Sequence, residues 1–270
     1  MKRIKRIFDV FGIYYGIKYA IAYQLHRCCY IKRLAKRVIR LKYKGTDLYV
    51  RLFSRDLDFL ESIYIGRYSQ GGWQGEYDLG GGEKDCLAYL DLGANIGLFT
   101  VMFAKQNPDK QFISVEPEKS NFQLLRKNTK TLKNVICINR GVWYRNTYTR
   151  IHESDVLVGI GKTPSEGGFY IEECDKESSD AKTVTIDCIL KKYGLKDVLV
   201  KMDIEGAEYG IFMKGSTNWI KDCKTLVLET HDRFSECYDE QEIFAVLEHS
   251  HRWKRKLGEN LIFVRKHEKL

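Results

Sequence analysis

One stretch, residues 87–106, constrains how the middle of this chain can fold. Residues 87–92 (LAYLDL) form a short apolar run, long enough for one buried strand. A glycine-bearing segment follows at 91–97 (DLGANIG), and apolar residues then recur at helical spacing from Leu98. Glycine is needed where a backbone turns sharply or lies close to a ligand. The order of strand, glycine turn and helix therefore predicts an α/β unit with a ligand at the start of the helix.

The spacing of the glycines excludes two phosphate-binding motifs. Gly93 and Gly97 stand four residues apart with Asn95 between them, so the dinucleotide motif G-x-G-x-x-G is absent. No G-K-[ST] follows, which excludes a P-loop. A D-x-G-x-N-x-G turn suits a small zwitterionic ligand, because Asp91 can bind an ammonium group and backbone N–H groups can bind a carboxylate. The alternative is a packing turn in an ordinary α/β unit.

Alternating strand-like and helix-like segments continue beyond this unit. Strands are predicted at 111–116, 134–139 and 197–202, and helices at 97–106 and 118–130. Such alternation indicates a parallel sheet with helices on both faces and ligands at the carboxyl ends of its strands. Glu116 ends the second strand about 20 residues after the turn, where an acid can accept both hydroxyls of a ribose. The combination predicts an adenosine-containing ligand.

Five segments of the chain carry a resemblance to a known family. The chain resembles the FkbM-type S-adenosylmethionine-dependent methyltransferases in YLDLGANIGLFT, ISVEPEKSNFQLLRKN, GVWYRN, VKMDIEGAE and LVLETH, in that order. The resemblance covers roughly residues 45–265. It implies a Rossmann-like class I methyltransferase fold, an α/β fold with a mostly parallel seven-stranded sheet, helices on both faces and a terminal hairpin. The implied reaction is O-methylation, often of a sugar hydroxyl in a glycan, glycolipid or glycosylated metabolite.

The same resemblance gives the cofactor residues. The residues expected to bind S-adenosyl-L-methionine lie at the carboxyl ends of the first three predicted strands. They are Asp91, Gly93, Asn95, Gly97, Glu116, Gly141 and Val142. We expect the backbone at 141–142 to lie beside the adenine.

The strand at 197–202 ends in three carboxylates, within the segment DIEGAE. An alcohol is a poor nucleophile, so methyl transfer to it needs a group that removes the hydroxyl proton. We expect Asp203 to be a substrate-binding or catalytic carboxylate and Glu205 to be the general base. His231 is the alternative base, since its intrinsic pKa suits proton transfer. The alternative is structural, with Glu205 and Glu208 holding backbone N–H groups or pairing with Lys201.

A magnesium site is a further prediction at the same strand ends. The strand at 224–228 is followed by Glu229 and Asp232, and neighbouring strands would bring these beside Asp203. Oxygen ligands of this kind suit Mg2+. Metal-dependent sugar and catechol O-methyltransferases have a similar arrangement. This chain has Glu-Thr-His-Asp in place of two adjacent acids or an acid–amide pair.

The positive charge of the chain lies in its first part. The formal net charge is +9, but residues 1–44 alone carry 13 Lys or Arg and one acid, Asp9, while the remainder is slightly acidic. We expect residues 1–44 to be a basic amphipathic helical extension, either packed on the core or lying on an anionic membrane surface. Nucleic-acid binding is disfavoured, because no recognised module accompanies the charge.

The remaining segments complete the predicted domain organisation. Residues 45–84 should hold a β-pair, whose first strand begins earlier at 41–43 and whose second is at 48–53, then a helix and a glycine-rich lid or connector. Residues 85–270 should form the methyltransferase domain with a hairpin insertion at about 147–185. The eight cysteines include no C-x-x-C pair, and no cleavable signal peptide is evident. We therefore expect a cytoplasmic enzyme, or one peripheral on the inner face of a membrane. The alternative function is a membrane-surface scaffold with a degenerate methyltransferase fold.

Overall fold

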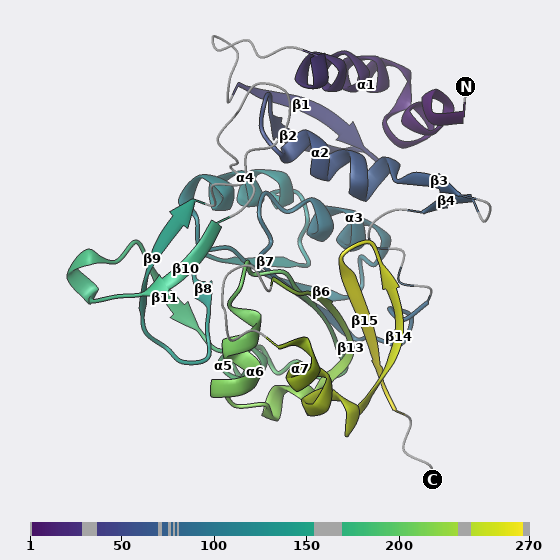
Figure 1. The fold of residues 1–270 in the computed structure, drawn as a ribbon. Helices are drawn as coiled ribbons and strands as arrows, with labels where there is room; N and C mark the ends of the chain where they lie inside the picture. Colours follow the sequence, from purple (N-terminus) through teal and green to yellow (C-terminus); the bar gives the residue numbers. More distant parts are fainter. Residues whose placement is uncertain are drawn as a thin grey trace.

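A seven-stranded sheet forms the centre of the computed structural model, which describes residues 2–28, 37–69, 72–74, 77, 79, 81–153, 169–231 and 239–266 (Figure 1). The strands lie in the order β14-β15-β13-β12-β5-β6-β7. Their bounds are β5 Ala88–Leu92, β6 Gln111–Val115, β7 Val135–Ile138, β12 Val198–Met202, β13 Cys223–Glu229, β14 His251–Leu257 and β15 Asn260–Arg265.

Most of the sheet is parallel. The strands β7, β6, β5, β12 and β13 pair in parallel, while β15 runs antiparallel between β13 and β14. Because β14 is in turn antiparallel to β15, β15 is the one strand that opposes the other six. The Rossmann-like α/β fold with a mostly parallel seven-stranded sheet, expected from the sequence, is confirmed.

Each face of the sheet has its own hydrophobic core. Successive side chains of a strand point to opposite faces, so Tyr89 of β5 joins one core and its neighbour Leu90 joins the other. The first core contains α3 (Leu98–Gln106) and α4 (Lys119–Thr129), and the second contains α5 (Ile186–Tyr193), α6 (Glu208–Lys214) and α7 (Glu240–Glu248). All five residues of β5 and of β12 are buried, as expected for strands covered on both faces.

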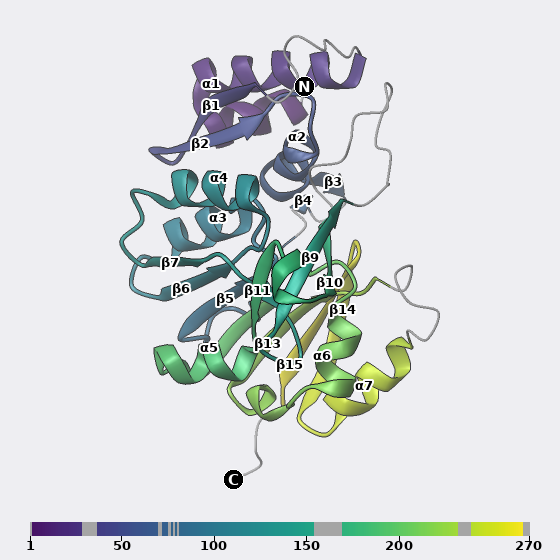
Figure 2. The same ribbon diagram turned by 90° about the vertical axis from the view of Figure 1, so that its left-hand side faces the viewer.

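An N-terminal layer covers the face that carries α3 and α4 (Figure 2). It consists of α1 (Lys2–Cys28), the antiparallel pair β1 (Val38–Tyr43) and β2 (Thr46–Arg51), α2 (Asp56–Leu60) and a π-helical turn, η2 (Glu61–Ile65). The strand predicted at 41–43 is confirmed as part of β1, while the helical prediction is wrong for residues 38–40; in β1 Leu41 and Tyr43 are buried and Arg40 and Lys42 are more exposed. That period of two fits a strand that pairs with β2.

The α1 helix is interrupted at Gly12, whose φ of 72° and ψ of 171° are not helical. Tyr64 of η2 joins this layer to the sheet domain, because its hydroxyl donates to the carbonyl oxygen of Leu98 at 2.9 Å. Among the described helices, none combines the length and the apolar character that crossing a bilayer would require.

Two smaller sheets complete the fold. A short pair, β3 (Arg67–Ser69) and β4 (Gly72–Gln74), lies in the predicted glycine-rich lid, several residues of which fall outside the described part of the chain. The predicted insertion at about 147–185 contributes three strands to a four-stranded sheet of order β10-β9-β11-β8. The three are β9 (Tyr148–Glu153), β10 (Phe169–Glu173) and β11 (Ala181–Val184), and the fourth, β8 (Gly141–Val142), precedes the insertion. Two 3-10 turns, η3 (Lys176–Ser178) and η4 (Asn218–Lys221), lie between the larger elements.

Candidate active site

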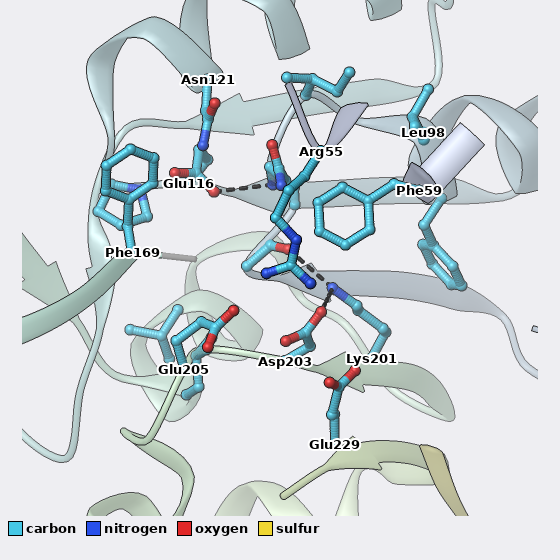
Figure 3. Close-up of a pocket in the computed structure, with 18 of the residues that line it drawn as sticks. Arg55, Phe59, Leu98, Glu116, Asn121, Phe169, Lys201, Asp203, Glu205 and Glu229 are labelled. Atoms are coloured by element: carbon cyan, nitrogen blue, oxygen red, sulfur yellow. Dashed lines mark hydrogen bonds and ion pairs between the residues drawn. The ribbon is translucent and has the colours of Figure 1, made fainter. Parts of the chain in front are cut away.

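A cavity of about 310 Å³ opens at the carboxyl ends of β5, β6, β12 and β13 (Figure 3). This is where parallel α/β sheets bind ligands, and the size suits a small organic molecule. Seven of the residues singled out from the sequence line it: Gly93, Asn95, Glu116, Val142, Asp203, Glu205 and Glu229. Four others, Asp91, Gly97, Gly141 and His231, are not among its lining residues. Asp232, the third predicted magnesium ligand, lies outside the described residues.

The glycine turn after β5 is held by hydrogen bonds to β6. The N–H groups of Gly93 and Ala94 both donate to the carbonyl oxygen of Val115, at 3.1 and 2.9 Å. Asn95, which has a φ of 50°, donates its N–H to Glu116 Oε2 at 2.9 Å. These N–H groups are therefore engaged within the protein, in contrast to the expectation that they would receive a ligand carboxylate.

Glu116 is the acid at the end of β6. It is 5% exposed, and its second oxygen, Oε1, accepts the N–H of Glu118 at 2.9 Å. Burial raises the pKa of Glu116 to about 7, although the two backbone hydrogen bonds oppose this shift. Each carboxylate oxygen keeps a second acceptor site, so the group is fixed in place and can still accept two hydroxyl groups.

Asp91 lies beneath the cavity and not in its wall. Its side chain is fully buried; Oδ2 accepts the hydroxyl of Thr100 at 2.5 Å, and Oδ1 lies 3.7 Å from Lys201 Nζ. Lys201 and Asp91 face each other across β12 and β5 as direct register partners. The ammonium group that the sequence assigns to a ligand of Asp91 is thus supplied here by the protein's own Lys201.

Lys201 connects Asp91 to the cavity. Its Nζ donates to the carbonyl oxygen of Gly93 at 2.9 Å and lies 3.1 Å from Asp203 Oδ2. Although burial opposes the charged form, Asp203 and Asp91 raise the pKa of Lys201. Burial likewise opposes ionisation of Asp203, but Lys201 and then His231 lower its pKa. Asp203 is therefore a carboxylate that faces the cavity with its orientation fixed from below (Figure 3).

The turn after β12 is organised by Glu208, which is fully buried. Its two oxygens accept the N–H groups of Ile204 and Gly206, each at 2.8 Å. The turn places the backbone of Glu205 at a φ of 53°, a conformation that residues other than glycine rarely adopt. Strain of this kind persists where the surrounding contacts enforce it, and it is common at functional sites. Glu208 therefore holds backbone N–H groups, as the structural alternative in the sequence analysis expected. Glu205, in contrast, lines the cavity.

His231 lies among four carboxylates, two residues after the end of β13. Its Nδ1 is 3.0 Å from Glu208 Oε1, and its Nε2 lies 3.4 Å from Glu229, 3.6 Å from Glu205 and 3.8 Å from Asp203. Burial favours the neutral ring, but hydrogen bonds with Glu208 and Glu229 raise the pKa of His231 to about 11. The ring is thus a cation at neutral pH, which makes it unsuited to accept a proton from a substrate.

Glu229 is an acid whose pKa is raised by its surroundings. Burial, followed by repulsion from Asp203, raises its pKa to about 8. Its side chain is 14% exposed and lines the cavity beside Lys201 and Asp203 (Figure 3). A carboxyl group with a pKa near neutrality therefore lines the same cavity as Glu205.

The predicted Mg2+ site of Asp203, Glu229 and Asp232 cannot be assembled from the described residues, because Asp232 lies outside them, and the group that they do bring together does not suit Mg2+. Asp203, Glu205 and His231 have potential ligand atoms within 4.8 Å of one another. Mg2+, however, prefers oxygen ligands in octahedral geometry, and one member of this group is an imidazole in its cationic form. Asp203 is also paired with Lys201, so two protein cations already balance the carboxylates that the ion would use.

Several cavity residues carry no signal in the sequence. Arg55 and Phe59 come from the N-terminal layer, and Phe169 comes from β10 of the insertion. The charge of Arg55 contributes to the lowered pKa of Asp203, and its guanidinium lies 4.9 Å from the centre of the Phe59 ring. Only the tertiary fold brings these three side chains to the strand ends.

Comparison with known proteins shows which family this chain matches. The model of the methyltransferase FkbM domain matches residues 91–259. No curated protein matches the chain. Among solved structures, M. jannaschii TYW2 in complex with AdoMet is 15% identical over 88% of this chain and 89% of that one, with a TM-score of 0.40. Precorrin-6y C5,15-methyltransferase from Geobacter metallireducens GS-15 is 13% identical over 67% of this chain and 82% of that one, with a TM-score of 0.34.

Proposed function

The chain belongs to the FkbM methyltransferase family, and from this premise we propose that it transfers the methyl group of S-adenosylmethionine to a hydroxyl group of a carbohydrate-containing acceptor. The observation that carries the proposal is the placement of Glu116 and a group of carboxylates in one cavity. Glu116 can accept hydrogen bonds from the ribose hydroxyls of a nucleoside. The carboxylates can attract the positively charged donor and accept a hydrogen bond from the hydroxyl of the methyl acceptor.

The donor side of the cavity consists of the glycine turn, Glu116 and Val142. The two free acceptor positions of Glu116 suit the two hydroxyls of a ribose, and Val142 offers an apolar contact for a base. S-adenosylmethionine supplies an electrophilic methyl group on a positively charged sulfur. Although burial opposes its ionisation, the carboxylate of Asp203, whose pKa is lowered chiefly by Lys201, offers negative charge that favours binding of such a cation.

The acceptor side consists of carboxylates and aromatic rings. Carboxylate oxygens accept hydrogen bonds from sugar hydroxyls, and the rings of Phe59 and Phe169 offer apolar surface for a sugar face. We assign Glu205 as the base that takes the hydroxyl proton and Asp203, held by Lys201, as the group that orients the hydroxyl. The proposed reaction does not use Mg2+, because Lys201 and His231 already neutralise negative charge of the carboxylates.

The first test is binding of S-adenosylmethionine, measured by isothermal titration calorimetry. Replacing Glu116 with glutamine should weaken binding about 10- to 100-fold, because hydrogen bonds from hydroxyls to a charged acceptor contribute roughly 1.5–3 kcal/mol. Glu248→Gln, the same chemical change at an exposed position of α7, should bind as the wild type does. Absence of binding to the wild-type protein would refute the proposal, and equal affinity of the Glu116 variant would refute the role of that residue.

The second test concerns Glu205. Glutamine keeps the size of the side chain but cannot accept the hydroxyl proton, so Glu205→Gln should slow methyl transfer about 100-fold or more while changing donor affinity by less than about twofold. Transfer of radiolabelled methyl groups to a panel of glycans and glycolipids would identify an acceptor and supply the assay. A variant that keeps more than half of the wild-type rate would show that another group, with Glu229 the first to examine, takes the proton.

A further inference from the structure

The outer face of α1 exposes an unusual amount of apolar surface. Eight large hydrophobic side chains are exposed among the described residues, and five of them lie on this one helix: Ile4, Ile13, Tyr14, Ile17 and Ile21. Ile13, Ile17 and Ile21 follow one another at intervals of four residues, which places them along one side of the helix. They are 71%, 49% and 57% exposed, so this side contacts little of the protein. Contiguous apolar surface of this kind marks an interaction site.

The inner face of the same helix is fixed to the protein. Ile7, Phe11 and Tyr19 are buried in the core that also contains β1, β2 and α3. Arg3 forms an ion pair with Glu61 of η2 at 2.9 Å, and the hydroxyl of Tyr19 donates to the same carboxylate. The inner face therefore packs on the protein, and the exposed isoleucines of the outer face are not needed for that packing. Figures 1 and 2 place α1 at the outer end of the molecule, beyond β1 and β2.

The charges around this face are almost all positive. Residues 13–28 contain no Asp or Glu, and Asp9 is the single acid in the first 44 residues of the sequence. The helix carries six Lys or Arg side chains. Arg3 and Arg6 contact η2 on the packed side, through Glu61 and the carbonyl oxygen of Tyr64. The other four are Lys2, Lys5, Lys18 and Arg27. Apolar side chains bordered by bases are the pattern of a helix that lies in the plane of an anionic membrane, with the isoleucines among the acyl chains and the bases at the phosphates.

We propose that α1 docks the protein on an anionic lipid bilayer, with Ile13, Ile17 and Ile21 as the inserted residues. The helix lies on the membrane and does not cross it. A second copy of the chain is a poorer occupant, because two faces with the same positive charge would repel each other. Nucleic acid is a poorer occupant too, because phosphate contacts would leave the isoleucines in water.

The test is co-sedimentation of the full chain with vesicles of phosphatidylglycerol and phosphatidylcholine, compared with vesicles of phosphatidylcholine alone. We expect binding to the anionic vesicles that weakens as salt is raised. The triple variant Ile13→Ser, Ile17→Ser, Ile21→Ser should lose at least about 10-fold in vesicle affinity. Leu87→Ser and Trp253→Ser make the same kind of change at side chains that are 64% and 60% exposed elsewhere, and both should bind as the wild type does.

Three outcomes would overturn the proposal. They are equal binding to neutral and anionic vesicles, unchanged binding of the triple variant, and a dimer in solution that the triple variant dissociates while vesicles bind neither protein. The binding of S-adenosylmethionine in solution should be the same for the wild-type protein and the triple variant. Failure of membrane docking would therefore leave the proposed reaction untouched.

Discussion

Replacing Lys201 with methionine should lower the free energy of unfolding by about 3–5 kcal/mol at pH 7, the cost of leaving a buried charge without its partner. Methionine keeps much of the length and apolar stem of the side chain but removes the ammonium group. Asp91, which is fully buried, would then retain only the hydroxyl of Thr100, since its Oδ1 has no hydrogen-bond partner among the described residues. Urea unfolding of both proteins measures the loss.

A double variant separates charge from packing. Asp91→Asn in the Lys201→Met background removes the unpaired carboxylate, so the double variant should recover most of the stability that the single variant loses. If the double variant is as unstable as the sum of the two single variants, then packing of the lysine stem and not its charge is what stabilises the site.

The destabilisation caused by Lys201→Met should depend on pH in a defined direction. Burial raises the pKa of Asp91 even with Lys201 present, and the pKa should rise further without it. A carboxyl group whose pKa is higher in the folded state stabilises the fold below its unfolded pKa and loses that contribution as pH rises through the folded value. The stability difference between wild type and Lys201→Met should therefore shrink as pH falls from 7 to 5. A difference that grows over this range would contradict the assignment.

Replacing Gly93 with alanine should be at least as damaging, at about 4 kcal/mol or more. Gly93 has a φ of 75°, and an added Cβ would lie 1.8 Å from the backbone carbonyl oxygen of Asp203. That atom belongs to the turn after β12, whose Asp203 N–H donates to the carbonyl oxygen of Leu92 at 3.2 Å. Neither backbone can move without separating β5 from β12 at the carboxyl ends, so the variant should lose donor binding as well as stability.

Gly194→Ala is the matched control for this clash. Gly194 has a similar φ of 62° at the end of α5, but a Cβ there would meet nothing within 4 Å. It should cost only the strain of the left-handed conformation, roughly 1–2 kcal/mol. Unfolding of both variants in urea tests the comparison. Equal losses would mean that conformational strain alone explains the effect at Gly93.

The sequence was most informative where the signal is local. The unit β5, glycine turn and α3 depends on neighbouring residues, and the strands that follow it in the chain lie within two residues of their predicted ends. The order of the strands is not local, yet the carboxyl ends of parallel strands must meet at one edge. For that reason Glu116 and Asp203 could be assigned to one site from patterns more than 80 residues apart.

The roles that the sequence did not predict correctly depend on contacts between distant segments. Lys201 is the fourth of the five residues of the buried strand β12, where an apolar residue is the ordinary choice, and this departure was the signal that the sequence offered. Its partner Asp91 becomes visible only when β5 and β12 are known to be neighbours. The charge state of His231 likewise depends on Glu208 at the start of α6 and Glu229 at the end of β13, so its intrinsic pKa suggested a base where the fold makes a cation.

The place of β15 in the sheet has a consequence for how the chain is assembled. β14 precedes β15 in the sequence, yet β15 lies between β14 and the rest of the sheet. During translation β14 therefore emerges with no neighbour to pair with, and the edge of β13 stays open until the following strand arrives. The last steps of folding must insert a strand beside an already formed edge, which makes this end of the domain the part most exposed to misassembly as the nascent chain grows.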